Sequence, residues 1–99
     1  MEVEFRDSKL ALIETDRAAE TKLPLSVITS ARRKLVMIRA APDERTMRNW
    51  KSLHYEQMSG NRQGERSIRL NDQWRMMLDI DGKHNPPKAI IREITNHYQ

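Results

Sequence analysis

The stretch Gly60–Arg75, Gly-Asn-Arg-Gln-Gly-Glu-Arg-Ser-Ile-Arg-Leu-Asn-Asp-Gln-Trp-Arg, decides the fold expected for this chain. Residues 67–70 alternate polar and apolar side chains, which is typical of a half-buried β-strand. The Asn-Asp pair at 71–72 favours a turn. Over residues 74–80 an apolar side chain recurs at every second position, which indicates a second strand with one buried face. The stretch and its continuation therefore predict a β-hairpin.

Arginines are threaded through this hairpin. A guanidinium group stays charged at physiological pH and matches phosphate oxygens in a bidentate way. Four such residues lie on or beside the two strands: Arg62, Arg66, Arg69 and Arg75. We expect them to form a phosphate-facing surface. The alternative is that Arg69 and Arg75 pair with Glu65, Asp79 or Glu93 across the sheet.

The rest of the chain predicts an α+β fold. The patterns indicate, in order, a strand at 3–5, a helix at about 7–16, a loop at 17–24, a helix between a Ser26 cap and Pro42, a helical turn around 47–50, the hairpin, and a last strand at 89–95. The order β-α-α-β-β-β predicts a small antiparallel sheet with two N-terminal helices packed on one face. With 99 residues, the chain is expected to form one domain over residues 1–99.

Charge and composition narrow the classes of function. The net charge is +4, with four cations and six anions in residues 1–31 and fourteen cations and eight anions in residues 32–99. This asymmetry favours a polyanionic partner for the second part of the chain. The absence of cysteine excludes a disulfide scaffold, a thiolate metal site and a cysteine nucleophile. No apolar run approaches the roughly 20 residues that span a bilayer, and no signal peptide is visible, so we expect no membrane contact and a cytoplasmic protein.

The hairpin also carries a resemblance to a known family. The pattern is Gly-x-Arg-x-Gly-x-x-Ser-Ile-Arg-x-Asn-x-x-Trp-Arg, filled by Gly60, Arg62, Gly64, Ser67, Ile68, Arg69, Asn71, Trp74 and Arg75. It resembles the HigB toxins of the RelE superfamily, and the expected layout of elements is similar over the whole chain. The resemblance implies a RelE-like fold and a ribosome-dependent endonuclease that cuts mRNA in the ribosomal A site. It also implies a HigA-type helix-turn-helix antitoxin, through which the toxin–antitoxin complex binds operator DNA.

Cleavage of RNA without a metal requires a base for the ribose 2′-hydroxyl, cations for the charge on phosphorus and an acid for the leaving oxygen. Histidine suits either proton-transfer role. We expect Arg69 and Arg75 to hold the phosphate, and His54, with His97 or Tyr98, to move protons. The family tail is commonly Asp-Tyr-His, whereas this chain has Asn96 before His97 and Tyr98, so the aromatic and imidazole groups have exchanged places. The assignment of base and acid between these groups stays open.

Other residues have simpler explanations beside the functional ones. The cations Arg32, Arg33 and Lys34 are expected either to contact RNA phosphates or to form a solvated helix face. Trp74 alternates in phase with the apolar strand positions, so we expect it in the core rather than stacked on a base. No spacing of His, Asp or Glu matches a metal site, and we expect neither a metal nor a cofactor.

Two other classes of function compete with the nuclease. The same basic sheet could bind RNA or an acidic protein without cutting it, because an altered tail leaves a binding surface intact. DNA binding by the helix that carries Arg32, Arg33 and Lys34 is the weakest alternative, since no second recognition helix follows a glycine-containing turn.

Overall fold

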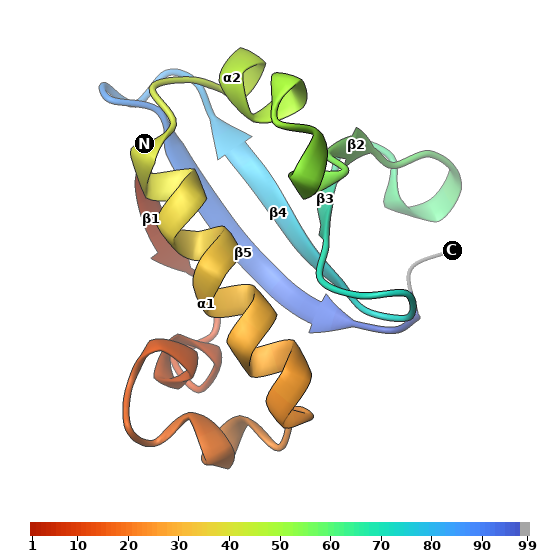
Figure 1. Cartoon of the computed structure of the whole chain (residues 1–99). Helices are drawn as coiled ribbons and strands as arrows, with labels where there is room; N and C mark the ends of the chain where they lie inside the picture. The colour runs from red at the N-terminus through yellow and green to blue at the C-terminus, as the bar shows by residue number, and fades with distance from the viewer. Residues whose placement is uncertain (98–99) are drawn as a thin grey trace.

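The computed structural model describes residues 1–97 and shows an α+β fold built on one five-stranded sheet (Figure 1). In chain order the elements are β1 (Glu2–Phe5), the 3₁₀ segments η1 (Leu10–Glu14) and η2 (Ala18–Thr21), α1 (Leu25–Ala40), α2 (Glu44–Asn49), η3 (Lys51–Leu53), β2 (Glu56–Gln57), η4 (Gly60–Arg62), β3 (Arg66–Arg69), β4 (Arg75–Asp81) and β5 (Lys88–Thr95). The strand order is β1-β5-β4-β3-β2. The predicted α+β class is confirmed.

The predicted hairpin is present as β3 and β4. The two strands are antiparallel, and Ile68 lies opposite Met76 while Arg69 lies opposite Arg75. The side chain of Asn71 closes the turn, because its Oδ1 accepts the backbone N–H of Gln73 at 2.9 Å and of Trp74 at 2.8 Å. This is the turn chemistry that an asparagine at such a position supplies.

The sheet is mixed, which corrects the expected antiparallel sheet. β1 pairs in parallel with β5, with Val3 opposite Ala89, while the other neighbouring strands are antiparallel. Parallel neighbours need a crossover of a dozen or more residues. Nearly the whole chain lies between β1 and β5, so nothing in the connection forces them to run in opposite directions.

The first of the two expected helices is wrong in type. Residues 10–14 and 18–21 form 3₁₀ segments, and the second of these lies in the expected loop. The guanidinium of Arg32 donates to the carbonyl of Ile13 at 2.7 Å and to that of Thr15 at 2.8 Å. The Thr15 carbonyl also accepts the backbone N–H of Ala18 at 3.2 Å, so Arg32 ties the chain between η1 and η2 to α1.

The second expected helix is α1, although Ser26 does not cap it. Pro24 is the N-cap residue and no side chain caps this end. The expected helical turn around 47–50 is α2, which begins earlier because Asp43 caps it and accepts the N–H of Thr46 at 2.8 Å. A two-residue strand, β2, was not expected.

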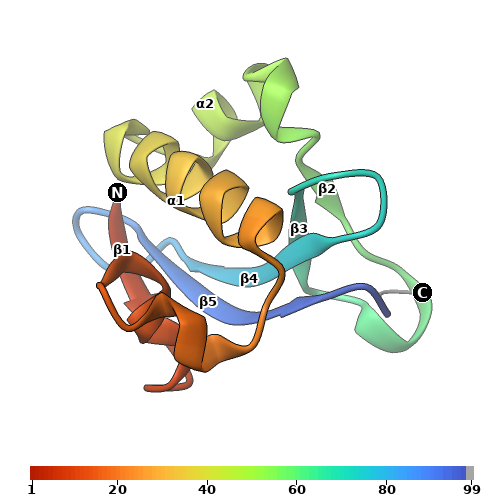
Figure 2. The ribbon, with the colours of Figure 1, turned by 60° about the horizontal axis from the view of Figure 1, so that its bottom comes forward.

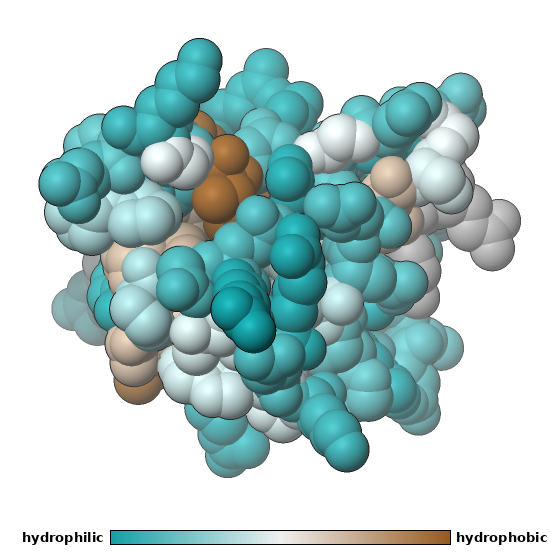
Figure 3. Space-filling model, turned by 90° about the horizontal axis from the view of Figure 1, so that it is seen from above, coloured by the Kyte–Doolittle hydropathy of each residue, from teal (hydrophilic) through white to brown (hydrophobic). Residues whose placement is uncertain are grey.

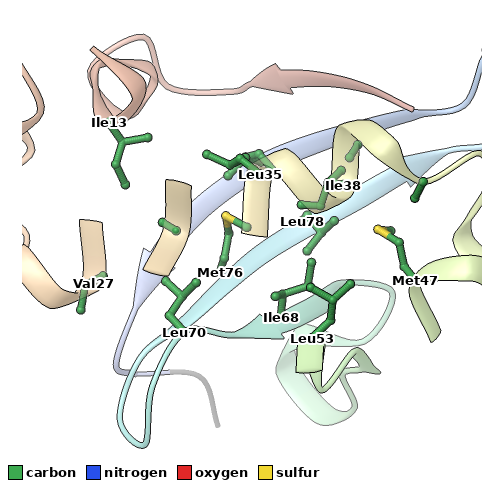
Figure 4. Close-up of a cluster of buried hydrophobic side chains, with 14 of the residues drawn as sticks. Ile13, Val27, Leu35, Ile38, Met47, Leu53, Ile68, Leu70, Met76 and Leu78 are labelled. Carbon is green, nitrogen blue, oxygen red and sulfur yellow. The ribbon is translucent and has the colours of Figure 1, made fainter. Parts of the chain in front are cut away.

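The core lies between α1 and one face of the sheet (Figures 2 and 4). From α1 it takes the buried residues Val27, Ile28, Ala31, Leu35 and Ile38, which recur at helical spacing on one side of the helix. The sheet contributes Ile68, Met76, Leu78, Ala89 and Ile91, and Leu70 follows directly after β3. Met47 of α2 and Leu53 of η3 pack on the same side. Trp74 packs against this core, as expected.

Shortening one core side chain of α1 tests this packing. Leu35 is fully buried, and Leu35→Ala should lower the free energy of unfolding by about 2–5 kcal/mol through lost burial and a residual cavity. The matched control is the neighbouring Val36→Ala, because Val36 is 66% exposed and its truncation should change stability by less than about 0.5 kcal/mol. Denaturant unfolding of both variants measures the difference. Equal losses would contradict the described orientation of α1.

Candidate active site

The sheet face away from α1 is here called the open face, and it is defined by Ser67, Arg69, Arg75 and Met77. Register pairs Ser67 with Met77 and Arg69 with Arg75, and these pairs alternate with the pairs that enter the core. Ser67 and Met77 are fully buried and Arg75 is 6% exposed, so this face is covered although α1 and α2 lie on the other side. In the described part of the chain, charged side chains joined in ion pairs cover it.

Arg75 is the centre of the open face. Its Nη2 donates to the carbonyl of His54 at 3.0 Å, and its guanidinium pairs with the carboxylate of Glu56. The Arg75 side chain is 7% exposed, whereas that of Glu56 is 58% exposed. A cation on the central strand β4 therefore holds the segment 54–56, and the carboxylate in this pair is the accessible partner.

His54 lies beside Arg75 through its backbone. It ends η3 with a left-handed conformation at φ 45°, which turns its carbonyl toward the guanidinium. Its side chain is exposed. His54 and Arg75 are therefore neighbours in the structure, but Arg75 contacts the backbone carbonyl of His54 and not its imidazole.

Arg69 lies directly opposite Arg75 in the sheet. Two like charges at opposite register positions repel unless each has a partner. Arg69 pairs with Asp72 in the hairpin turn, and Arg75 pairs with Glu56. The side chain of Asp72 is 90% exposed. The two arginines thus start from opposite positions of neighbouring strands, and each is compensated by a carboxylate that solvent reaches.

A second group of charges covers the middle of the open face. Arg62 pairs with Glu93 at 2.7 Å and with Glu65 at 3.1 Å, and Arg92 pairs with Asp79 at 2.7 Å and with Glu65 at 3.0 Å. The bond to Glu93, then that to Glu65, raises the pKa of Arg62. The carboxylates that were considered as partners of Arg69 and Arg75 therefore pair with these two arginines instead. An open hollow of about 600 Å³ adjoins them, lined by Arg6, Asp7, Ser8, Glu65, Arg92 and Glu93.

The end of β5 brings His97 to this network. The Nη2 of Arg62 donates to the carbonyl of His97 at 2.9 Å, and Thr95 Oγ1 accepts the N–H of His97 at 2.9 Å. Thr95 lies opposite Arg75 in the sheet. The backbone of His97 is thus anchored near the open face, while the predicted site residue Tyr98 lies outside the described residues.

The other cations expected to bind RNA lie elsewhere. Arg66 is opposite the core residue Leu78, and its Nε donates to Glu44 of α2 at 3.0 Å, so its side chain points away from the open face. Lys34 donates to the carbonyl of Ser52 at 3.0 Å. Arg32 holds the end of η1, and Arg33 is exposed without a hydrogen bond or ion pair to residues 1–97.

Sequence reasoning missed Glu56 and Arg92 as members of this face. Glu56 lies two residues after His54, so period-2 alternation would have linked them, but a two-residue strand has too short a pattern to be recognised. Arg92 lies at a register irregularity of β5, which alternation cannot predict. Among residues 1–97 no group of three or more His, Cys, Asp or Glu is arranged to hold a metal ion.

The top of the molecule in the view of Figure 1, which faces the viewer in Figure 3, offers little apolar area. Seen from above, it is mostly hydrophilic with a small hydrophobic area (Figure 3). The large hydrophobic residues exposed in the described part are Leu25 at 78% and Val36 at 66%. None of the helices described here is long and apolar enough to cross a membrane.

Comparison with known proteins identifies the family. A model described as the RelE-like toxin of the type II toxin–antitoxin system HigB matches residues 3–86. The chain belongs to the HigB-like toxins. It is 32% identical over 83 residues to Toxin HigB-1 of Vibrio cholerae serotype O1, covering 83% of this chain and 87% of that protein. A YoeB/ParE toxin from Agrobacterium tumefaciens has a similar fold, with a TM-score of 0.60 at 12% identity over 99% of this chain and 100% of that one.

Family membership makes this HigB-like chain the toxin of a type II toxin–antitoxin system, and it implies an antitoxin as partner. The family match ends at residue 86, before β5 and the tail. The placement of His97 and Arg92 therefore comes from the structure of this chain.

The two neighbouring arginines of α1 should behave differently when truncated. Arg32→Ala removes two charge-assisted bonds to the carbonyls of Ile13 and Thr15 and should lower the free energy of unfolding by about 1.5–3 kcal/mol. Arg33→Ala should change it by less than about 0.5 kcal/mol. Thermal or denaturant unfolding checks both. If Arg32→Ala leaves stability unchanged but weakens RNA binding, Arg32 is a phosphate ligand rather than a structural tie.

Proposed function

We propose that this toxin is a metal-independent endoribonuclease that cuts mRNA on the ribosome, in the A site, and that a HigA-type antitoxin neutralises it. The observation that supports this most is the register pair Arg69–Arg75 on the open face, next to Glu56 and close to the anchored His97. A guanidinium group matches phosphate oxygens in a bidentate way, and these two start from opposite positions of neighbouring strands. Family membership supplies the toxin function to which this chemistry is assigned.

The proposed reaction is a transfer within the RNA. A base takes the proton of a ribose 2′-hydroxyl, and that oxygen attacks the adjacent phosphorus. The bond from phosphorus to the 5′-oxygen breaks, leaving a 2′,3′-cyclic phosphate, and an acid protonates the departing oxygen. Arg69 and Arg75 stabilise the charge that develops on the phosphate oxygens during this step.

We assign the base to Glu56 in preference to His54. The Glu56 carboxylate contacts the Arg75 guanidinium, so a phosphate on Arg75 would lie within reach of it. His54 contacts Arg75 through its carbonyl, and its exposed imidazole has no bond to the described residues. The acid is assigned to His97, which follows β5, or to Tyr98.

The ion pairs offer a reason for dependence on the ribosome. In the free chain Arg69, Arg75 and Arg62 each hold a carboxylate, so a phosphate must displace Asp72, Glu56 or Glu93 before it binds. When a flexible RNA binds, its contacts must offset both the free energy of breaking these ion pairs and the entropy lost as the RNA becomes ordered. Substrate held in the A site is already ordered, and such positioning is worth about 7–11 kcal/mol in the best cases.

The same ion pairs support the second candidate function. A face whose arginines are compensated within the chain also suits a module that binds RNA or an acidic protein without cutting it. The affinity for RNA would then increase with the number of phosphates that the arginines neutralise, and it would fall as salt is added. Product analysis separates this candidate from the nuclease.

The direct test is to map mRNA ends after expression without an antitoxin. We expect growth arrest and cuts inside translated codons, and purified toxin should cut ribosome-bound message much faster than naked RNA. Cyclic phosphate ends on the products would support attack by the 2′-hydroxyl. Equal rates on free and bound RNA would contradict ribosome dependence, and binding without products in both reactions would favour the non-catalytic module.

Exchanging single groups tests the assignment of the base. Glu56→Gln keeps the shape of the side chain but removes the carboxylate, and it should lower the single-turnover rate on ribosome-bound message by about 10²–10⁴-fold. His54→Ala should lower it less than Glu56→Gln does, since the carbonyl that binds Arg75 remains. The reverse order would return the role of base to His54.

A further inference from the structure

The segment that carries His54 and Glu56 has little backbone support. β2 contains only Glu56 and Gln57 and lies at the edge of the sheet, paired on one side with β3. Strands this short contribute few ladder bonds, and edges of sheets open most readily. A side chain on such a strand needs other bonds to stay in place at the level of about 0.5 Å that a reactive group requires.

Arg75 provides these bonds from the open face. It holds the carbonyl of His54 and the carboxylate of Glu56, one residue on each side of Tyr55. One of these two bonds is made by the carboxylate of Glu56, which is the proposed base. If a phosphate displaces Glu56 from Arg75, the segment loses part of its support at the moment when the position of Glu56 matters most.

Tyr55 provides a second attachment from the opposite side. Its hydroxyl donates to Glu44 Oε2 at 2.6 Å, and the same oxygen accepts Arg66 Nε at 3.0 Å. Arg48 lies 3.5 Å from this oxygen. Because Tyr55 and Glu56 are consecutive, an extended backbone directs them to opposite sides. The three residues Glu44, Tyr55 and Arg66, here called the edge triad, therefore join β2 and β3 to α2 on the covered face.

The edge triad is partly buried and charged. The side chains of Glu44 and Arg66 are 21% and 24% exposed, and the ring of Tyr55 packs against the core. Burial alone would raise the pKa of Glu44, but the bonds from Tyr55 and Arg66 outweigh it and the pKa lies below its usual value. Burial, and then the bond to Glu44, raises the pKa of Tyr55, so its hydroxyl remains a donor.

The far end of the edge triad is fixed in the fold. Glu44 is the first residue of α2, which Asp43 caps through the backbone N–H of Thr46. Met47, on the same short helix, is fully buried in the core. Arg66 also donates to the carbonyl of Gly64 at 2.8 Å, which ties the loop before β3 to the same group.

We infer that the edge triad positions the segment 54–56 for catalysis, with Tyr55 and Glu44 as positioning residues that never touch the RNA. This inference rests on the proposed function, because it concerns the placement of Glu56 during cleavage. In this proposal Arg66 holds Glu44 in place and does not bind RNA. Held by Tyr55, the segment keeps its path when phosphate replaces Glu56 on Arg75.

The test uses Tyr55→Phe, which removes the hydroxyl and keeps the ring. Met58 directly follows β2, and its backbone N–H donates to the carbonyl of Glu65. We expect the amide hydrogen of Met58 to exchange with solvent faster in this variant, as measured by NMR on the free protein. The single-turnover rate on ribosome-bound message should fall by up to about 10²-fold, the effect of a misplacement of about 1 Å, while KM changes little. In a Glu56→Gln background the substitution should have no further effect on the rate.

Thr46→Val is the matched control, since it removes another hydroxyl bond of α2, to Asp43 at 2.8 Å, that does not involve β2. It should alter neither Met58 exchange nor the rate. Unchanged exchange in Tyr55→Phe, or rate losses proportional to lost stability in both variants, would overturn the inference. A wild-type chain that cleaves nothing overturns the proposed function instead, and the exchange result still decides whether the edge triad holds β2.

Discussion

The buried guanidinium of Arg75 is the contact on which the open face depends. It lies on β4, a central strand of the sheet, and binds both a carbonyl and a carboxylate of a segment that otherwise has a two-residue strand. A buried charge is tolerated only when its partners satisfy it. The segment 54–56 therefore stabilises Arg75, and Arg75 places the segment. The group that completes the fold on this side is thus also the one to which we assign the phosphate in the proposed function.

Residues with a repeating environment could be predicted from the sequence. The hairpin follows from period-2 alternation over 67–80, and α1 follows from apolar residues at three- and four-residue spacing. The 3₁₀ form of residues 10–14 was not predicted, because the apolar pattern of so short a segment does not distinguish a 3₁₀-helix from an α-helix. Contacts from far along the chain, such as those of Arg32 to the carbonyls of Ile13 and Thr15, are likewise absent from a local pattern. The parallel pairing of β1 with β5 is equally a property of the whole topology, which local patterns do not contain.

The candidate site could be predicted only as a set of cations. Arg69 and Arg75 occupy opposite positions of the hairpin, but their partners Asp72 and Glu56 were not predicted. Glu65, Asp79 and Glu93 were considered as partners for the hairpin arginines and instead pair with Arg62 and Arg92. The geometry that decides each pairing is the loop path over 54–65, and that path depends on η3, β2 and η4, elements too short to leave a periodic pattern.

Net charge is consequently a poor measure of how strongly the open face attracts phosphate. The chain carries +4, yet each arginine placed on or over this face has at least one carboxylate within the chain. The side chains of Asp72 and Glu56 are 90% and 58% exposed, so water can solvate them when they are displaced, while Glu65 at 15% exposure is harder to move. A ligand would therefore exchange first at Arg69 and Arg75. In the proposed function, the ease of displacement, rather than the count of cations, is therefore the reason to expect phosphate at that pair.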